Sequence, residues 1–347
     1  MFYIHHTVCI SPQNTFPKVE LEQLIDCSEN KLYAKDFPVA DVPTAQLRRM
    51  GKAVKLGVAA SLPLFKKYDK FDGIIIGTSN GGMEDCIKFL NQIMQYEEGV
   101  LTPTNFVQST PNAIASQLGF LSKNNGYNIT HVHRGLSFEN ALIDAGMLLE
   151  DYPDNKYLVG GIDEISTYNF NIDYLCGYVK KELISNNKLY NSKTEGSLAG
   201  EGVAMFVINN NREGATSKFR AIETIHTTEE NELQAVCHKF LNDNLSEKES
   251  IDLFLSGENG DSRYTSSCES VEKMVNENIP VARFKHMSGE FRTASAFSLW
   301  VANYIIQTQQ IPAHMLKKNF SKGGFNNILI YNNYQGFQHS FMLLSKS

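Results

Sequence analysis

Two histidines and a serine lie close together around a strand-to-helix turn in the first half of the chain. His131 and His133 end a short apolar run, and Ser137 follows where the pattern becomes helical. Because side chains alternate along a strand, both imidazoles should lie on one face. A serine beside a histidine, with Glu258 or Glu290 to orient the base, supplies the ingredients of acyl-ester or thioester hydrolysis.

Two other interpretations of these residues stay open. Ser137, in the first helical turn, can instead bond the free amide N–H groups there. The two histidines can also be interpreted as metal ligands, although no third ligand occurs at a typical spacing. The residue types alone do not separate a hydrolase from a helix cap.

The elements around this turn indicate a layered α/β fold, because short apolar runs alternate with longer stretches of helical period. The candidate strands are 3–10, 73–77, 128–132, 157–162, 202–208, 219–225, 251–256, 326–331 and 340–344. The candidate helices are 44–65, 83–95, 112–118, 137–149, 229–241, 267–276 and 294–307. A similar order of elements occurs twice, so we expect two similar halves with a seam near 209–218.

The composition excludes several classes of protein. With 347 residues, of which 42% are hydrophobic and 20% charged, the chain can bury a large core. A net charge of −6, with no basic stripe, argues against binding of nucleic acid. No apolar run approaches about 18 residues and the start does not resemble a signal peptide, so we expect a cytoplasmic protein without membrane insertion. Six scattered cysteines indicate neither a zinc site nor a disulfide framework.

Several segments resemble the β-ketoacyl synthase family of the thiolase superfamily, and they occur in that family's order along nearly the whole chain. They are the strand-turn-helix at 126–142, the glycine turn at 74–82, the preceding segment 103–115, and the strands at 158–164, 200–207 and 323–328. The resemblance implies a thiolase-like fold with five layers, αβαβα. Its N-terminal half would span 1–208 and its C-terminal half 219–347, packed together as one unit.

The catalytic residues of that family are replaced in this chain. Gly135 stands where the family has its acyl-carrying cysteine. The family's first histidine, in Asn-Ala-His-Gly-Thr-Gly-Thr, aligns with Gly257, and the second, in Lys-Ser-x-x-Gly-His, aligns with Glu290. Lys285 matches the lysine of the second pattern and could form an internal ion pair with Glu290. Without the nucleophile and both imidazoles, the resemblance implies that the usual condensation is absent.

Two further segments bear on the acyl tunnel of the family. The family's Phe-Gly-Phe-Gly-Gly-Thr-Asn loop is matched to 320–326, which puts Lys322 in the place of a gating phenylalanine and Phe325 in the place of the threonine. Within 103–115, which in the family packs near the subunit interface, Phe106, Val107 and Gln108 are candidates for tunnel-facing residues. The alternative for these three is packing in the core or in an interface.

Ketosynthase-like subunits without the cysteine pair with active ketosynthases as chain-length factors in type II polyketide and aryl-polyene or flexirubin-type systems. The resemblance therefore implies a catalytically degenerate subunit that shapes the acyl tunnel of a partner ketosynthase and is not an enzyme as an isolated chain. The dimer could be a heterodimer or a homodimer. No cofactor of its own is expected, because acyl groups would arrive on the phosphopantetheine of an acyl carrier protein. The alternatives are a hydrolase or acyltransferase that uses Ser137, and a non-catalytic module that binds the carrier protein.

Overall fold

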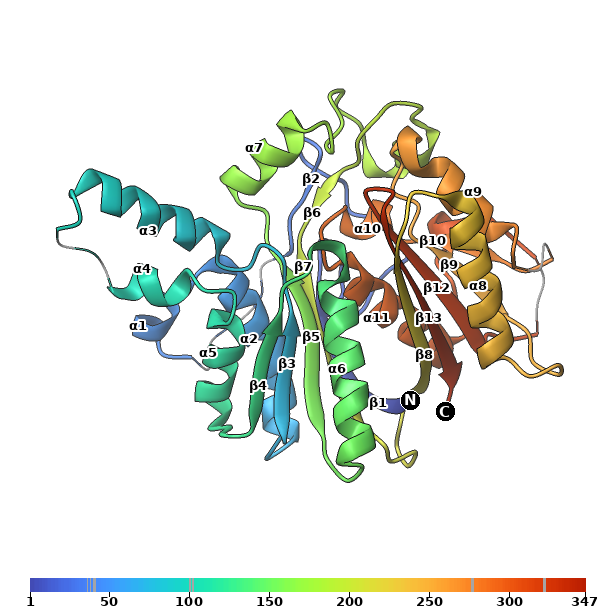
Figure 1. Ribbon diagram of the computed structural model, residues 1–347, viewed down its shortest axis with the longest axis horizontal. Helices are drawn as coiled ribbons and strands as arrows, with labels where there is room; N and C mark the ends of the chain where they lie inside the picture. The colour runs from blue at the N-terminus through green and yellow to red at the C-terminus, as the bar shows by residue number, and fades with distance from the viewer. Residues whose placement is uncertain are drawn as a thin grey trace.

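One mixed sheet of eleven strands forms the frame of the molecule. The computed structural model describes residues 1–35, 37, 39, 42–99, 101, 103–275, 278–320 and 323–347. The strand order is β11-β10-β9-β12-β13-β8-β1-β7-β5-β3-β4. Figure 1 shows the two ends of the sheet on opposite sides of the molecule.

The strands on either side of the β1–β8 contact come from different parts of the chain. The first group is β1 (Phe2–Ile10), β3 (Gly73–Gly77), β4 (Tyr127–His131), β5 (Tyr157–Asp163) and β7 (Gly202–Asn209). The second group is β8 (Ser217–His226), β9 (Leu253–Ser256), β10 (Val281–Arg283), β11 (Leu316–Lys318), β12 (Asn327–Tyr334) and β13 (Gln338–Lys346). The chain passes between the groups at 210–216, within the predicted seam, whereas the division into units 1–208 and 219–347 stays a prediction.

The long helices form three layers around these strands. On the outer side of the first group lie α2 (Lys52–Lys67) and α5 (Ala113–Ser122), and on the outer side of the second lie α8 (Glu230–Asn244) and α9 (Thr265–Glu272). Between the groups lie α6 (Ser137–Asp151) and α11 (Ala294–Thr308), which contact strands of both. The layers therefore read αβαβα, and the predicted fold class is confirmed.

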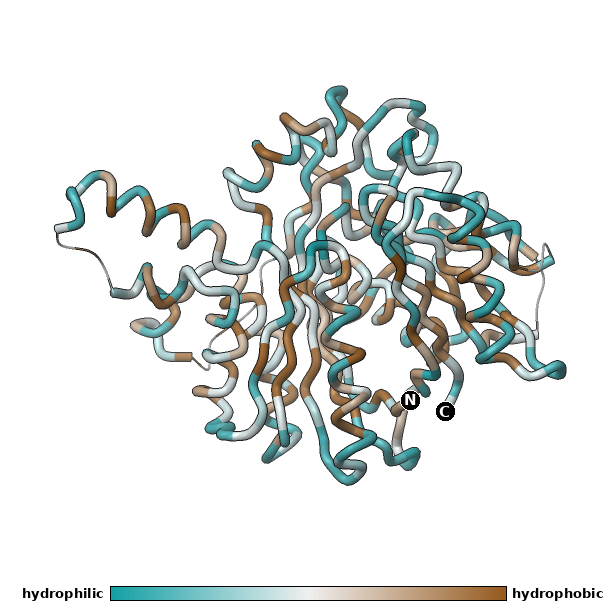
Figure 2. Tube along the Cα trace, viewed as in Figure 1, coloured by the Kyte–Doolittle hydropathy of each residue, from teal (hydrophilic) through white to brown (hydrophobic). Residues whose placement is uncertain are grey.

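Side-chain alternation along the strands produces this layering. In β3, Ile75 packs into the central cluster, whereas Ile74 and Ile76 pack against the outer helices. In β12, Ile330 points to the centre and Leu329 to the opposite outer layer. Figure 2 shows hydrophobic residues along the strands and on the helix faces that cover them.

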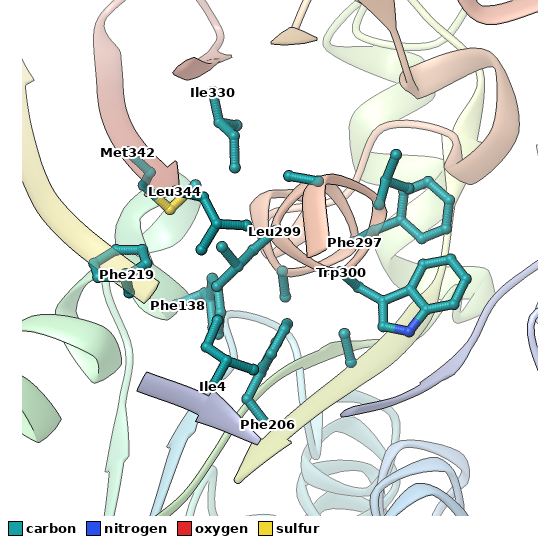
Figure 3. Packing of buried hydrophobic residues seen from close by; sticks show 14 of the residues in the cluster. Ile4, Phe138, Phe206, Phe219, Phe297, Leu299, Trp300, Ile330, Met342 and Leu344 are labelled. Atoms are coloured by element: carbon teal, nitrogen blue, oxygen red, sulfur yellow. The ribbon is translucent and has the colours of Figure 1, made fainter. Parts of the chain in front are cut away.

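The helix α11 is the centre of the core. Twelve of its fifteen residues are buried, as expected of a helix that is apolar nearly all round. Figure 3 shows Leu299 and Trp300 of α11 among side chains from both strand groups, including Phe206 of β7 and Met342 of β13. Burial of each such large side chain contributes about 1.5–3 kcal/mol.

Shorter elements complete the described chain. The helices are α1 (Thr44–Leu47), α3 (Met83–Gln95), α4 (Pro103–Gln108), α7 (Thr167–Leu175) and α10 (Lys285–Ser288). The 3₁₀ turns are η1 (Arg134–Leu136), η2 (Asn186–Asn191), η3 (Ser262–Tyr264) and η4 (Ala313–Met315). A second, small sheet pairs β2 (Lys31–Leu32) with β6 (Ala199–Gly200).

The predicted helix at 44–65 is wrong in one respect, because two helices, α1 and α2, occupy that range. Gly51 has an extended backbone and begins α2, so the chain turns between the two. The sequence patterns did not predict α4, α7, α10, β10 or β11, which span only three to nine residues each. Along the parts of the chain that the structure describes, no helix combines the length and apolar character needed to cross a bilayer.

The two ends of the sheet differ in chemistry. The strand β4 pairs on one side with β3 and has no strand on its other side among the described residues. At the opposite end, β11 has three residues, and two of them, Lys317 and Lys318, form ion pairs with Glu272. Short strands with charged side chains are a common means of blocking a sheet edge.

A buried acid in the central layer makes stability depend on pH. Glu139 of α6 is fully buried and accepts a hydrogen bond of 2.8 Å from Ser340 Oγ of β13. Burial raises the pKa of the Glu139 carboxyl from 4.5 to about 7. The folded state therefore binds more protons than the unfolded state between these values, and stability falls as the pH rises through this range.

We expect Glu139→Gln to be more stable than the wild type at pH 8, by on the order of 3 kcal/mol, and the difference to vanish near pH 4.5. Urea unfolding of both proteins from pH 4.5 to 8 measures this. Glu164, whose pKa burial also raises to about 7, is present in both proteins and cancels in the comparison. The same pH dependence in both proteins would contradict the assignment.

Candidate functional site

The strand-to-helix turn predicted to carry chemistry is present, and it consists of β4, η1 and α6. Ser137 closes the turn: its Oγ accepts a hydrogen bond from His133 N (2.8 Å) and donates one to Arg134 O (2.9 Å). Ser137 is fully buried. Because the Oγ bonds His133 N, which precedes the helix, and no N–H of the first turn of α6, Ser137 holds the turn together and is not a helix cap.

The structure contradicts the proposed serine–histidine pair. His131 Nε2 lies 2.9 Å from Asp144 Oδ2, on the side of α6. His133 Nδ1 accepts from the Asn140 side chain (3.0 Å), and its ring stacks on His226. Burial, followed by the neighbouring His226 and Arg134, lowers the pKa of His133. Because both imidazoles have other partners and Ser137 bonds only backbone groups, the hydrolase interpretation loses its geometric basis.

Gly135 lies buried in η1, and Tyr334 occupies the space beside it. A Cβ atom on Gly135 would lie 2.3 Å from Tyr334 Cβ and 2.4 Å from Tyr334 Cγ. The Gly135 N–H donates to Gln338 Oε1 at 2.9 Å. The turn therefore has neither a nucleophile nor, as it stands, room for one.

Gly257 directly follows β9, in an equally crowded place. Its N–H donates to Tyr331 O at 2.7 Å, and a Cβ atom would lie 2.7 Å from the same oxygen and 2.9 Å from Asn332 Cα. An imidazole at this position would need the backbone of β12 to move.

Lys285 and Glu290 form the internal ion pair that their spacing suggested. Lys285 Nζ lies 2.7 Å from Glu290 Oε2 and 2.9 Å from Glu290 Oε1, and Lys285 is fully buried. Lys285 Nζ also donates to Asn333 O (3.0 Å), and Asn259 Nδ2 donates to Glu290 Oε2 (2.7 Å). The pair thus satisfies its own charges and hydrogen bonds.

Little open space remains at this site. A cavity of about 30 Å³ is lined by Asn259, Glu290, Arg292 and Tyr334, among others. Such a volume holds roughly one or two water molecules, far less than a drug-sized ligand needs.

The assignment of the family's gating loop to 320–326 is corrected by the structure. Lys322 lies outside the described residues. Phe325 precedes β12, where its N–H donates to Gln309 Oε1 at 2.7 Å. Tyr334 is at the other end of this eight-residue strand, roughly 25 Å away. Phe325 therefore lies far from Gly135.

The segment that does reach Gly135 is the end of the β12–β13 hairpin, with Tyr334 and Gln338 paired across it. The sequence patterns did not predict the place of this hairpin end. One signal was present: Gln335 and Gly336, both with positive φ, separate two apolar runs of strand length, which is typical of a hairpin turn.

The three tunnel candidates lie on or next to the surface. Phe106 and Val107 of α4 are each 58% exposed, and the ring of Phe106 packs on Phe89 of α3. Gln108 is half-buried and lines a groove of about 380 Å³ with Val107 and Phe120. This exposure excludes core packing for Phe106 and Val107, whereas a role in an interface or tunnel stays a prediction.

Metal chemistry has no visible basis in the described ranges, since no three His, Cys, Asp or Glu side chains there gather closely enough to hold an ion. His131 and His133 in particular have the other partners given above.

Comparisons with known proteins agree with this architecture. Residues 25–172 match the family model of the β-ketoacyl synthase N-terminal domain. The chain is ketosynthase-like. The comparison with curated proteins found no match.

Solved structures of ketosynthases share the fold of the ketosynthase-like chain over its whole length. A β-ketoacyl synthase from Burkholderia phymatum STM815 is 12% identical, with a TM-score of 0.79 over 100% of this chain and 99% of that one. The ishigamide ketosynthase/chain length factor is 14% identical, with a TM-score of 0.79 over 100% and 99%. The ketosynthase ApeO in complex with its chain length factor ApeC, from Xenorhabdus doucetiae, is 13% identical, with a TM-score of 0.76 over 100% and 98%.

We expect the isolated ketosynthase-like chain to keep its unmodified mass after incubation with an acyl carrier-protein thioester. Gly135 has no side chain to acylate, and Ser137 is buried and bonded to backbone groups. Intact-protein mass spectrometry measures this, with an active ketosynthase as the positive control. A stoichiometric acyl adduct that disappears in Ser137→Ala would contradict the expectation and revive the hydrolase hypothesis.

Proposed function

We propose that this chain is a catalytically degenerate β-ketoacyl synthase-like subunit that pairs with an active ketosynthase and shapes its acyl tunnel, as a chain-length factor does. The observation that carries the proposal is the state of the three catalytic positions. Gly135, Gly257 and Glu290 lack the family's thiol and imidazoles, while the ketosynthase fold around them is complete. A fold retained without its chemistry suits a role in binding and shaping.

The surface of α3, α4 and α5 supports association with a partner. No residue of α3 is fully buried, although the helix carries a stripe of apolar residues. Figure 1 shows α3 and α4 projecting from the body, and Figure 2 shows hydrophobic residues along α3. The large side chains exposed here are Leu90, Met94, Tyr96, Phe106, Val107 and Phe120. Apolar surface gathered on one side is typical of an interaction site.

The free edge of β4 lies next to this surface and adds unpaired backbone groups to it. Val132, directly after β4, is 51% exposed. A permanent ketosynthase dimer would cover such an area, since obligate interfaces bury more than about 2,000 Å² and are apolar.

A basic cavity supports the second partner, an acyl carrier protein. The cavity has a volume of about 520 Å³ and lies between the start of α2, the start of α3, and α4. Five basic and three acidic side chains line it. Lys52 is paired with Glu201, and Lys88 with Glu84 and Asp85, which leaves Arg48, Arg49 and Lys55 as the basic side chains that face a partner. Basic side chains around a concave surface suit a phosphate-bearing or acidic partner. Acyl groups would then arrive on phosphopantetheine, in fatty-acid, polyketide or aryl-polyene-type synthesis.

Coexpression with an active ketosynthase from the same source tests the pairing. We expect the two chains to copurify at one-to-one stoichiometry by native mass spectrometry, because association buries the exposed apolar surface. Leu90→Glu with Met94→Glu should abolish the complex, whereas a charge reversal on the opposite edge, Lys318→Glu, should leave it intact. A homodimer that ignores the ketosynthase would reject the chain-length-factor role and favour a separate carrier-binding module.

We expect Phe106→Ala to lengthen or broaden the products of the reconstituted pair, because the substitution removes an aromatic side chain from the wall that this chain would contribute. Product chain lengths from carrier protein and a malonyl donor measure the effect. The matched control is Phe320→Ala, a partly exposed phenylalanine just after β11 at the other end of the sheet. An unchanged profile in Phe106→Ala, with the pair intact, would reject the tunnel assignment for this residue.

A further inference from the structure

Acyl chemistry at a ketosynthase-like turn needs space for the side chain of a nucleophile and a free backbone N–H for the oxyanion. The end of the β12–β13 hairpin blocks both. Tyr334 fills the space where a side chain on Gly135 would begin, with 2.3 Å between its Cβ and the added Cβ. Gln338 Oε1 accepts the Gly135 N–H. A backbone N–H at such a turn is the type of donor that stabilises an oxyanion, and here it is already bonded.

The side chain of Tyr334 is held firmly in this place. Tyr334 is 5% exposed, and its ring packs edge-on against Phe337. Arg292, fixed by two hydrogen bonds of 2.6 Å to Asp173, lies next to the ring. Burial raises the pKa of the Tyr334 hydroxyl to about 12, so the side chain stays neutral at physiological pH.

The backbone of the hairpin end is also fixed. Gly336 N donates to Asn333 Oδ1 (2.8 Å), and the buried Lys285 donates to Asn333 O (3.0 Å). Gln338 Nε2 donates to His226 Nε2 (3.1 Å), which orients the amide so that its oxygen faces Gly135. Glu290, at one of the replaced catalytic positions, helps to fix the hairpin end because its ion pair holds Lys285 in place.

We infer that Tyr334 and Gln338 form a built-in plug that closes this chain's own acyl site, so that it admits neither an acyl group nor the phosphopantetheine arm. The inference rests on the proposed function in one respect only, which is the identity of the excluded ligand as an acyl group on phosphopantetheine. The cavity that borders Tyr334 is lined by Asn259 and Glu290 and not by Gly135, and its volume of about 30 Å³ compares with roughly 300–1,000 Å³ for pockets that bind small molecules. In a complex with a ketosynthase, the growing chain must therefore lie on the partner's side of the shared tunnel.

The plug also explains which substitutions must accompany a new nucleophile. In Gly135→Cys the added Cβ collides with Tyr334, so one of the two has to move. In Gly135→Cys with Tyr334→Gly the colliding Cβ, Cγ and Cδ1 atoms are all removed, and the thiol faces the opened space. Restoring the nucleophile alone therefore gives neither a relaxed fold nor an accessible thiol.

A double-mutant cycle on the isolated chain tests the plug. The variants are Gly135→Cys, Tyr334→Gly and their combination, with Gly135→Cys/Tyr334→Phe as the control that keeps the ring. Thermal unfolding midpoints and the rate of iodoacetamide labelling at position 135, located by peptide mass spectrometry, are the readouts. Peptide-level location is needed because native cysteines such as Cys176 are exposed.

We expect Gly135→Cys to lower the midpoint by several degrees and Tyr334→Gly to recover part of that loss in the double variant. Labelling of Cys at 135 should be at least about tenfold faster in the double variant than in the single variant or the phenylalanine control, since the buried thiol reacts only through local opening. Equal labelling rates and no coupling between the two sites would overturn the plug.

A second measurement covers the case in which Gly135→Cys does not fold. Tyr334→Gly alone leaves a cavity with the shape of the lost side chain, and engineered cavities of this kind bind matching small molecules. We expect p-cresol to raise the unfolding midpoint of Tyr334→Gly but not that of the wild type or Tyr334→Phe. No response in Tyr334→Gly would overturn the inference that the side chain of Tyr334 fills the site.

These outcomes are separable from those of the proposed function. Pairing with a ketosynthase is measured on the complex, whereas accessibility at position 135 is measured on the isolated chain. An open site in a chain that still pairs would reject only the plug, and a closed site in a chain that does not pair would reject only the chain-length-factor role.

Discussion

The carboxylate of Asp163, at the end of β5, joins the first group of strands to the central helix α11 at the level of the candidate site. Its Oδ1 accepts hydrogen bonds from Thr78 Oγ1 (3.1 Å), Ser79 N (2.9 Å) and Asn80 N (2.7 Å), in the loop after β3. Its Oδ2 accepts from Thr293 N (3.1 Å) and Thr293 Oγ1 (2.9 Å), at the start of α11. Because Thr293 follows Glu290 and Arg292 in the chain, this one side chain sets where the central helix begins and where the pocket residues before it lie. Burial of a carboxylate is tolerated here because five donors surround it.

Much of the fold could be predicted from the sequence, because period and alternation depend on which side chains must be buried. The predicted strand 73–77 and helix 83–95 match β3 and α3 at both ends. Short elements such as β10 were not predicted, because three residues are too few to show a hydrophobic period. The ketosynthase-like order of segments was also readable, since glycine turns keep recognisable spacing even at 12–14% identity to solved structures.

The candidate site was predictable only in part. The assignment of Gly135, Gly257 and Glu290 to replaced catalytic positions rests on local patterns and stays a prediction, whereas the gating loop was assigned wrongly. Gly323 and Gly324 resemble the family's glycine pair, yet they lie before β12, whereas the turn that reaches Gly135 lies after it. The contact between Gly135 and Tyr334 joins residues far apart in the sequence, and no local pattern encodes it. The same limit applies to Ser137 and the two histidines, whose partners come from α6, the backbone and β8.

The unequal edges of the sheet have a consequence for how many copies can assemble. The β4 edge offers free backbone groups beside an apolar surface, whereas the β11 edge is short and occupied by lysines paired with Glu272. If a partner joins at the β4 edge, this chain has only the blocked β11 edge left to offer, so it cannot extend the assembly further. The paired lysines of β11 would then end growth on this side of the complex, and filaments of stacked sheets would not form.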